Sequence, residues 1–209
     1  SNPNCPNKNH QHVRPFLQDT GELTRGFNGV SGLGSRSIYR GMKWGVALLD
    51  PSTRPLVDDL VAAGEVDSAF SGRPVDYNKD GTLKVVVLMS SGENKPSVRI
   101  AAEKYDEPSE LVHWSRNNLL YYLDRHVDEV EHKNWYQEEE DRASGDTLLK
   151  NVCKAAHDQG IIIYVVAFDI ADDEYDELEL GENPYEGQDP LSYCASSPSH
   201  YHQAYGDEL

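Results

Sequence analysis

A polar turn with the sequence SSGEN offers oxygen atoms directly after the apolar run VVVL, which spans Val85 to Leu88. Apolar residues without alternation indicate a central strand that is covered on both faces. In open α/β sheets, ligands bind beyond the carboxyl ends of such strands. The turn holds the hydroxyl group of Ser91 at its second position, whereas Mg²⁺ prefers carboxylates plus water. We therefore interpret Ser91 as a turn residue and, at most, a weak ligand.

A second stretch, DYNKDGT, has the spacing that opens a calcium-binding loop. Its candidate ligands alternate along the chain and are Asp76, Asn78, Asp80 and Thr82. Val87 occupies the position where such loops carry a bidentate glutamate, and Asp-Gly is also a common turn. The sequence favours a turn here, with calcium binding as the alternative.

The rest of the sequence contains no grouping that is typical of an enzyme. It has no HExxH motif, no nucleophile elbow and no phosphate-binding loop. The cysteines Cys5, Cys153 and Cys194 form no CxxC pair, which argues against a zinc site. An oxidising compartment permits one disulfide and one free thiol, whereas the cytosol would keep three thiols. We predict a protein that is not an enzyme and needs no cofactor.

Composition excludes several classes of partner. The chain has 209 residues and a net charge of −17, which argues against nucleic acid and anionic membrane surfaces as partners. No apolar run approaches the length of a membrane span. The length suits one domain with long loops, or one domain with an insertion.

The elements that must position these residues alternate between strand and helix. Apolar runs predict strands at 83–89 and 161–168. Apolar periodicity and capping signals predict helices at 19–27, 35–49, 56–63, 147–159 and 189–194. Short edge strands are expected at 12–18 and 200–203. This order predicts an α/β fold with a parallel sheet, in which the two main strands are adjacent and helices 36–49 and 147–159 pack on it.

Residues 97–145 interrupt this pattern. We expect a hairpin around Ser115 to Asn118, because Tyr, Trp and Val favour strands and paired asparagines favour turns. The sequence EEEDRASGD is expected to be a charged loop. Aromatic residues are dense here: Trp114, Tyr121, Tyr122 and Trp135. They could form a partner-binding patch or the small core of the hairpin, and the sequence does not decide between the two.

Four segments in order, GSRSIYRGMKWGVALLDPS, LKVVVLMSSGEN, CKAAHDQGIIIYVVAF and LSYCASSPSHYHQA, resemble the von Willebrand factor A-like domain of TadG-type proteins of the tight-adherence (Flp) pilus assembly system. The resemblance implies a doubly wound, Rossmann-like, mostly parallel sheet in the periplasm, anchored to the bacterial inner membrane through a segment absent from this chain. It also implies that residues 1–209 are a single domain fragment that is incomplete at its N-terminal side and carries an insertion at 97–145.

The resemblance further implies a degenerate form of the metal-dependent adhesion site of A domains. The Asp-x-Ser-x-Ser turn is missing, and the expected threonine before the glycine-bearing helix falls on Arg36 or the neighbouring Ser35 or Ser37. Ser91 replaces the aspartate of the third loop, two residues before Glu93. We expect no metal bound in the family's manner. Arg36 either occupies the vacant site, bonding to Glu93 or to carbonyl groups, or points into solvent.

A periplasmic location implies an oxidising environment, in which we expect Cys153 and Cys194 to form the disulfide and Cys5 to stay free. The function that follows from the resemblance is a non-enzymatic protein-interaction module. Its expected partners are other pilus-assembly or envelope proteins. They would bind through the C-terminal edge of the sheet and the aromatic residues between 111 and 136. The alternative is an adhesion domain that binds calcium or magnesium through the 76–82 loop or the top edge of the sheet.

Overall fold

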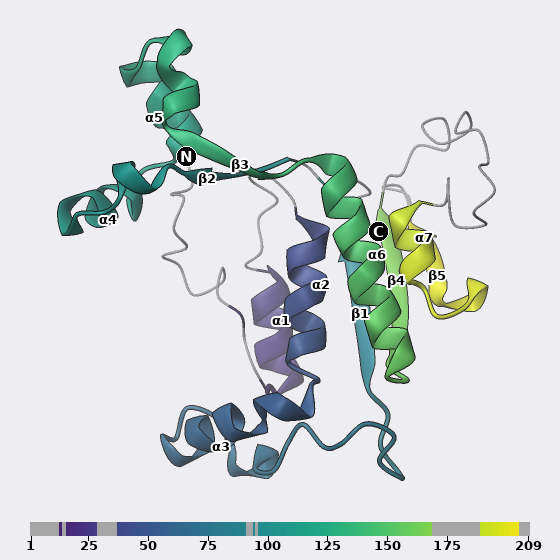
Figure 1. Cartoon of the computed structure of the whole chain (residues 1–209). Coiled ribbons are helices and arrows are strands. Elements are labelled where there is room, and N and C mark those ends of the chain that lie inside the picture. Colours follow the sequence, from purple (N-terminus) through teal and green to yellow (C-terminus); the bar gives the residue numbers. More distant parts are fainter. Residues whose placement is uncertain are drawn as a thin grey trace. The chain divides into compact units, whose positions relative to one another are not determined.

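The computed structural model describes residues 13, 16–28, 37–90, 94, 96–168 and 189–204 (Figure 1). The chain forms two compact units. Unit 1 consists of residues 1–36 and 96–141, and unit 2 consists of residues 37–95 and 142–209. The second segment of unit 1 overlaps almost completely with the predicted insertion at 97–145.

Unit 2 is built on a parallel sheet whose strand order is β1-β4-β5. Its strands are β1 (Val85–Ser90), β4 (Ile162–Phe168) and β5 (Tyr201–Ala204). Val85 of β1 lies opposite Ile162 of β4, and the register continues without a shift to the end of β1. The predicted adjacent, parallel arrangement of the two apolar strands is therefore confirmed, and the chain has an α/β fold.

The described part of unit 2 contains α-helices and short 3₁₀ helices. They are α2 (Ile38–Ala47), α3 (Arg54–Ala62), α6 (Arg142–Asp158) and α7 (Pro190–Cys194), with short 3₁₀ helices η2 (Pro51–Thr53), η3 (Ser68–Phe70) and η7 (Pro198–His200). Ser37 caps α2 and Asp189 caps α7 through side-chain oxygens that accept backbone N–H bonds. Pro51 and Pro55 end the first helical stretch and start the next, as the sequence predicts.

The core of unit 2 lies on one face of its sheet. Ile163, Val165 and Ala167 of β4 are fully buried and belong to one hydrophobic cluster with residues of α2, α6 and α7. In Figure 1, α2 and α6 run side by side along the sheet. Because side chains alternate along a strand, the residues between these three point to the opposite face. Those residues are half-buried rather than buried.

Unit 1 contains an antiparallel ribbon and several short helices. The ribbon pairs β2 (Ser97–Ile100) with β3 (Tyr136–Glu140). The helices are α1 (Thr20–Asn28), α4 (Pro108–Trp114) and α5 (Leu119–His126), with η4 (Ala102–Lys104) and η5 (Glu129–Asn134). The predicted helix at 19–27 is confirmed. The predicted edge strand at 12–18 is wrong for its described residues 13 and 16–18, which adopt no regular structure.

Two predictions for residues 97–145 are wrong. The expected hairpin around Ser115 to Asn118 is a pair of helices. Glu107 and Glu110 form a capping box at α4, and the Asn118 side chain accepts the backbone N–H of Tyr121 to cap α5. Local capping thus overrides the strand propensity of the aromatic residues. The expected charged loop EEEDRASGD instead contains the end of β3 and the first turn of α6.

Candidate functional site

The C-terminal edge of the unit 2 sheet, where the sequence predicts a degenerate metal site, is organised around Asn94. This side chain is only 2% exposed. Its oxygen accepts a 2.9 Å hydrogen bond from the backbone N–H of Ile38, the first residue of α2. Its amide nitrogen donates a 2.7 Å bond to Oδ1 of Asp146 on α6. The turn after β1 is therefore joined to two helices through one neutral amide.

Gly145 allows this close approach. A Cβ atom at position 145 would lie 3.3 Å from the side chain of Asn94, which is tighter than ordinary van der Waals contact. Asp146, which precedes the predicted helix at 147–159, lies inside α6, because this helix begins at Arg142, and its carboxylate accepts the Asn94 bond. The role of Asn94 was not predicted from the sequence, because both of its partners lie more than fifty positions away in the chain.

A second carboxylate, that of Asp189, belongs to the same region. It accepts bonds from the backbone N–H groups of Leu191 (3.1 Å) and Ser192 (3.2 Å) and from the Tyr201 hydroxyl (3.2 Å). Burial raises the pKa of Asp189, the negative charge of Asp146 raises it further, and the three hydrogen bonds oppose this rise. Asp189 thus serves mainly as the half-buried cap of α7.

The described residues at this edge offer little for a divalent cation, which takes six or more oxygen ligands with negative charge among them. Ser37 caps α2, with its Oγ 3.4 Å from the backbone nitrogen of Arg40. No group of three or more His, Cys, Asp or Glu side chains with metal-binding geometry occurs in the part of the chain that the structure describes. The other predicted positions of the degenerate site lie outside the described residues and stay predictions: Ser35, Arg36, Ser91 and Glu93.

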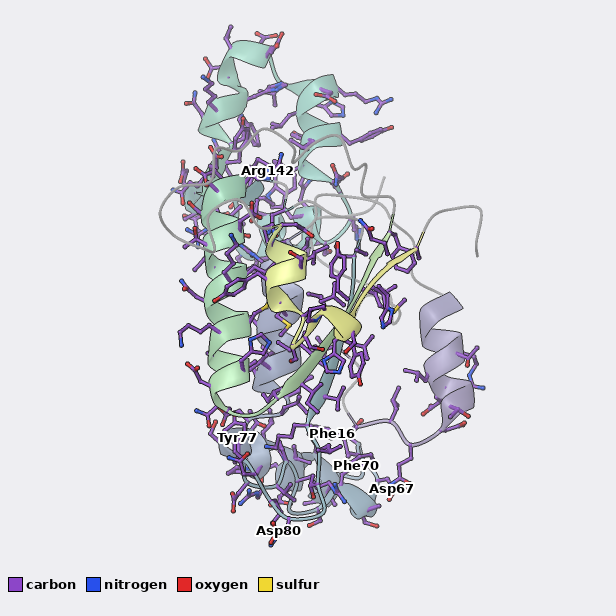
Figure 2. The ribbon with its side chains drawn as sticks, turned by 90° about the vertical axis from the view of Figure 1, so that its right-hand side faces the viewer. Phe16, Asp67, Phe70, Tyr77, Asp80 and Arg142 are labelled. Atoms are coloured by element: carbon purple, nitrogen blue, oxygen red, sulfur yellow. A yellow bond between two sulfur atoms is a disulfide. The ribbon has the colours of Figure 1, made fainter. Side chains whose placement is uncertain are left out.

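The predicted calcium loop lies at the opposite end of unit 2. Figure 2 shows Tyr77 and Asp80 far from Arg142, the first residue of α6. Oδ1 of Asp76 lies 2.7 Å from the guanidinium group of Arg54, which lowers the pKa of Asp76 and places a positive charge where a calcium ion would need to bind.

The remaining residues of this loop have the character of a turn. Asn78 has a left-handed φ of 56°, and Gly81 has a φ of 73°. Thr82 donates its backbone N–H to the carbonyl of Lys79. The geometry supports the interpretation of residues 76–82 as a turn.

The four predicted partner-binding aromatic residues belong to unit 1, where three of them form its own core. Trp114 is 3% exposed and donates its indole N–H to the carbonyl of Lys104 (2.7 Å). Tyr122 and Trp135 pack against it at ring-centroid distances of 5.5 and 6.4 Å. Of the two interpretations that the sequence left open, the core applies to these three. Tyr121 is exposed, and the guanidinium group of Arg125 lies over one face of its ring.

The disulfide joins α6 to α7. Cys153 and Cys194 are fully buried, their Cα atoms lie 5.1 Å apart, and their pairing is the predicted one. A groove lined by α6 and residues 192–201 lies beside it. Its polar groups bond within the protein: Lys154 pairs with Asp158 at 2.7 Å, and Nε2 of His157 lies 3.0 Å from the Cys194 carbonyl oxygen. The contact between His157 and Cys194 therefore joins α6 to the end of α7.

The clearest unpartnered feature of unit 2 is a row of apolar side chains on β1. Val85, Val87 and Met89, here called the β1 stripe, are all exposed, and Val87 has 59% of its surface in contact with solvent. Leu83 continues the row before the strand and is also exposed. The sequence predicts a central strand covered on both faces, but among the described residues β1 pairs only with β4 and lies at an edge of the sheet, with one face exposed.

Comparisons with protein-family models, with curated proteins and with solved structures found no match. Among the described residues, no helix has the length and the apolar character needed to cross a lipid bilayer.

Proposed function

We propose that this chain is a non-enzymatic protein-interaction module of a TadG-type pilus-assembly protein, working in the bacterial periplasm with other assembly or envelope proteins. The von Willebrand factor A-like character of the fold is part of this proposal. It rests on the four ordered sequence segments described above and is compatible with the parallel α/β sheet of unit 2. The buried Cys153–Cys194 disulfide supports an oxidising compartment, because structural disulfides persist there and are rare in the cytosol.

The observation that carries the proposal is the β1 stripe. Soluble proteins rarely leave a contiguous row of large apolar side chains exposed, and such rows commonly mark binding sites for other proteins. The stripe has no charged residue, no proline and no bulge, the usual means by which an edge strand avoids association. An interaction surface accounts for these features more simply than a catalytic or metal site does.

The test is to replace Val87 with lysine in the chromosomal gene of the source bacterium and to count surface pili by electron microscopy. A charge in the centre of the stripe should abolish partner binding and reduce pilus number strongly. The matched control is Leu56→Lys, because Leu56 lies on α3 of the same unit and is 57% exposed, almost as much as Val87. Normal pilus number in the Val87→Lys strain, at equal protein level, would refute the proposal.

A further inference from the structure

The charge of the chain is divided unevenly along its length. Residues 1–49 contain six lysine or arginine residues and two aspartate or glutamate residues, so this part has a net charge of +4. Residues 50–209 contain 13 basic and 34 acidic residues, so the remainder has a net charge of −21. An asymmetry of this kind indicates that the basic part has a partner of its own.

Two of the six basic residues, Arg40 and Lys43, lie on α2, a helix that has no acidic residue. Arg40, Lys43 and Trp44 occupy positions i, i+3 and i+4, so they share one side of the helix, here called the α2 face. All three are exposed, and Trp44 has 59% of its surface in contact with solvent. Ile38 and Met42 are buried on the opposite side. The α2 face therefore combines positive charge with a large aromatic ring.

A glycine leaves room beside the tryptophan. Gly41 precedes Trp44 by three positions, so the two residues are neighbours on the helix surface. A Cβ atom at position 41 would meet no atom of the described residues within 4 Å. An apolar side chain of a partner can therefore reach the flank of the indole ring. Tryptophan and arginine are also the residue types that most often supply the binding energy of protein interfaces.

The charge of the α2 face selects an acidic partner, and the charge of the remaining chain limits the size of that partner. An extended polyanion, such as a nucleic acid or an anionic membrane, would bring many negative charges within about 8 Å of the acidic remainder and would be repelled. A short acidic segment of polypeptide can place its carboxylates on α2 alone. Its apolar residues can pack on Trp44 at the same time.

We propose that the α2 face binds a short acidic segment of another protein, with carboxylates against Arg40 and Lys43 and an apolar side chain against Trp44. This surface is distinct from the β1 stripe. Met42 of α2 shares a core cluster with Ile163 of β4, so α2 covers the face of the sheet that lies opposite the stripe. The inference goes beyond the proposed function and does not depend on it.

The test uses a fluorescent peptide in which leucines are spaced among glutamates, and a control peptide with glutamine in place of glutamate. The 209-residue chain should bind the acidic peptide in fluorescence anisotropy, and the affinity should fall as salt is added. Arg40→Glu/Lys43→Glu should weaken binding at least about tenfold, and Trp44→Ala at least about fivefold. The matched control is Arg73→Glu/Lys79→Glu, which changes the net charge equally at two exposed residues of the same unit and should stay within about twofold of the wild type. Urea unfolding confirms that each variant is folded.

Three results would overturn the inference: no binding of the acidic peptide, equal binding of the glutamine peptide, or an equal loss in the α2 variant and its control. Tighter binding of an oligonucleotide or of vesicles that contain anionic lipid, at the same salt concentration, would also overturn it. So would a dimer in sedimentation equilibrium that Arg40→Glu/Lys43→Glu dissociates, because the occupant would then be a second copy. Loss of pili in the Val87→Lys strain without binding of the acidic peptide would reject this inference alone. Peptide binding with normal pili in that strain would reject the proposed function alone.

Discussion

The side-chain amide of Asn94 donates a 2.7 Å hydrogen bond to the carboxylate of Asp146, while its oxygen accepts one from the backbone of Ile38. One neutral residue thus connects the turn after β1, the start of α2 and α6 at the edge where α/β sheets commonly bind ligands. Both polar ends of the amide are engaged, so this part of the edge has a structural role.

Replacing Asn94 with alanine should destabilise the chain by about 1–3 kcal/mol, because the buried N–H of Ile38 and the carboxylate of Asp146 both lose a partner. Urea unfolding followed by circular dichroism measures this loss. Ser52→Ala, a change of an exposed hydroxyl, is the control and should cost less than about 0.5 kcal/mol. An Asn94→Ala variant as stable as the control would show that these hydrogen bonds contribute nothing.

The half-buried carboxylate of Asp189 should make the stability of the chain depend on pH. Its folded pKa is raised above the ordinary 3.8 by burial, so folding favours the protonated form. Its contribution to stability is therefore fully present below the unfolded pKa and is lost as pH rises through the raised folded pKa. Asp189→Asn should remove this pH dependence of stability. It should keep most of the hydrogen bonding that caps α7, because asparagine is also a good N-cap.

Urea unfolding at a series of pH values tests this prediction. The stability of the wild-type chain relative to Asp189→Asn should fall as pH rises from below 3.8 to neutrality. Asp189→Ala should be less stable than Asp189→Asn by about 1 kcal/mol, because it also loses the cap of α7. A difference in unfolding free energy between the wild-type chain and Asp189→Asn that stays the same at every pH would contradict a raised pKa of Asp189.

The Cys153–Cys194 disulfide closes a sequence separation of 41 residues, so its loss should destabilise the chain by about 4 kcal/mol in the loop-entropy model. Thermal unfolding of a Cys153→Ala/Cys194→Ala variant would show this, with Cys5→Ala as the control that keeps the bridge. A thiol titration of the unreduced, unfolded wild-type chain should find one free thiol. Three free thiols in protein from an oxidising compartment would be incompatible with the bridge.

Trp114 should matter for the stability of unit 1. Truncation to alanine removes a buried ring and its hydrogen bond to Lys104, and it should cost about 3–5 kcal/mol. Tyr121→Ala is the matched control in the neighbouring helix. Tyr121 is 48% exposed, and its loss should cost less than about 1 kcal/mol. Urea unfolding monitored by circular dichroism separates the two, and equal stability of both variants would contradict a core role for Trp114.

The elements with strong local signals were predictable from the sequence. The apolar runs of β1 and β4 correctly predicted a parallel pair, and Asp189 followed by proline correctly predicted the start of α7. These signals depend on residues that are close in the chain. The disulfide pairing followed from the family resemblance together with the positions of Cys153 and Cys194 on either side of β4.

The failures arose where local capping signals were missed and where contacts between distant residues decide the structure. Trp114 and Tyr122 favour strands by propensity, but capping at Glu107 and Asn118 selects helices that bury these rings together. The engagement of Asn94 with α2 and α6 depends on contacts across more than fifty positions in sequence, which local patterns do not contain. The exposure of the β1 side chains could likewise not be predicted from the sequence, because the composition of β1 is that of a strand covered on both faces.

Photo-cross-linking in living cells tests the central claim most directly. A photoreactive phenylalanine analogue would replace Val87 in cells of the source organism, with Leu56 as the control position of nearly equal exposure. We expect a cross-link from position 87 to another protein, which mass spectrometry identifies, and none from position 56. No protein cross-link at position 87, or the same products at both positions, would contradict the claim that this chain works through the β1 stripe.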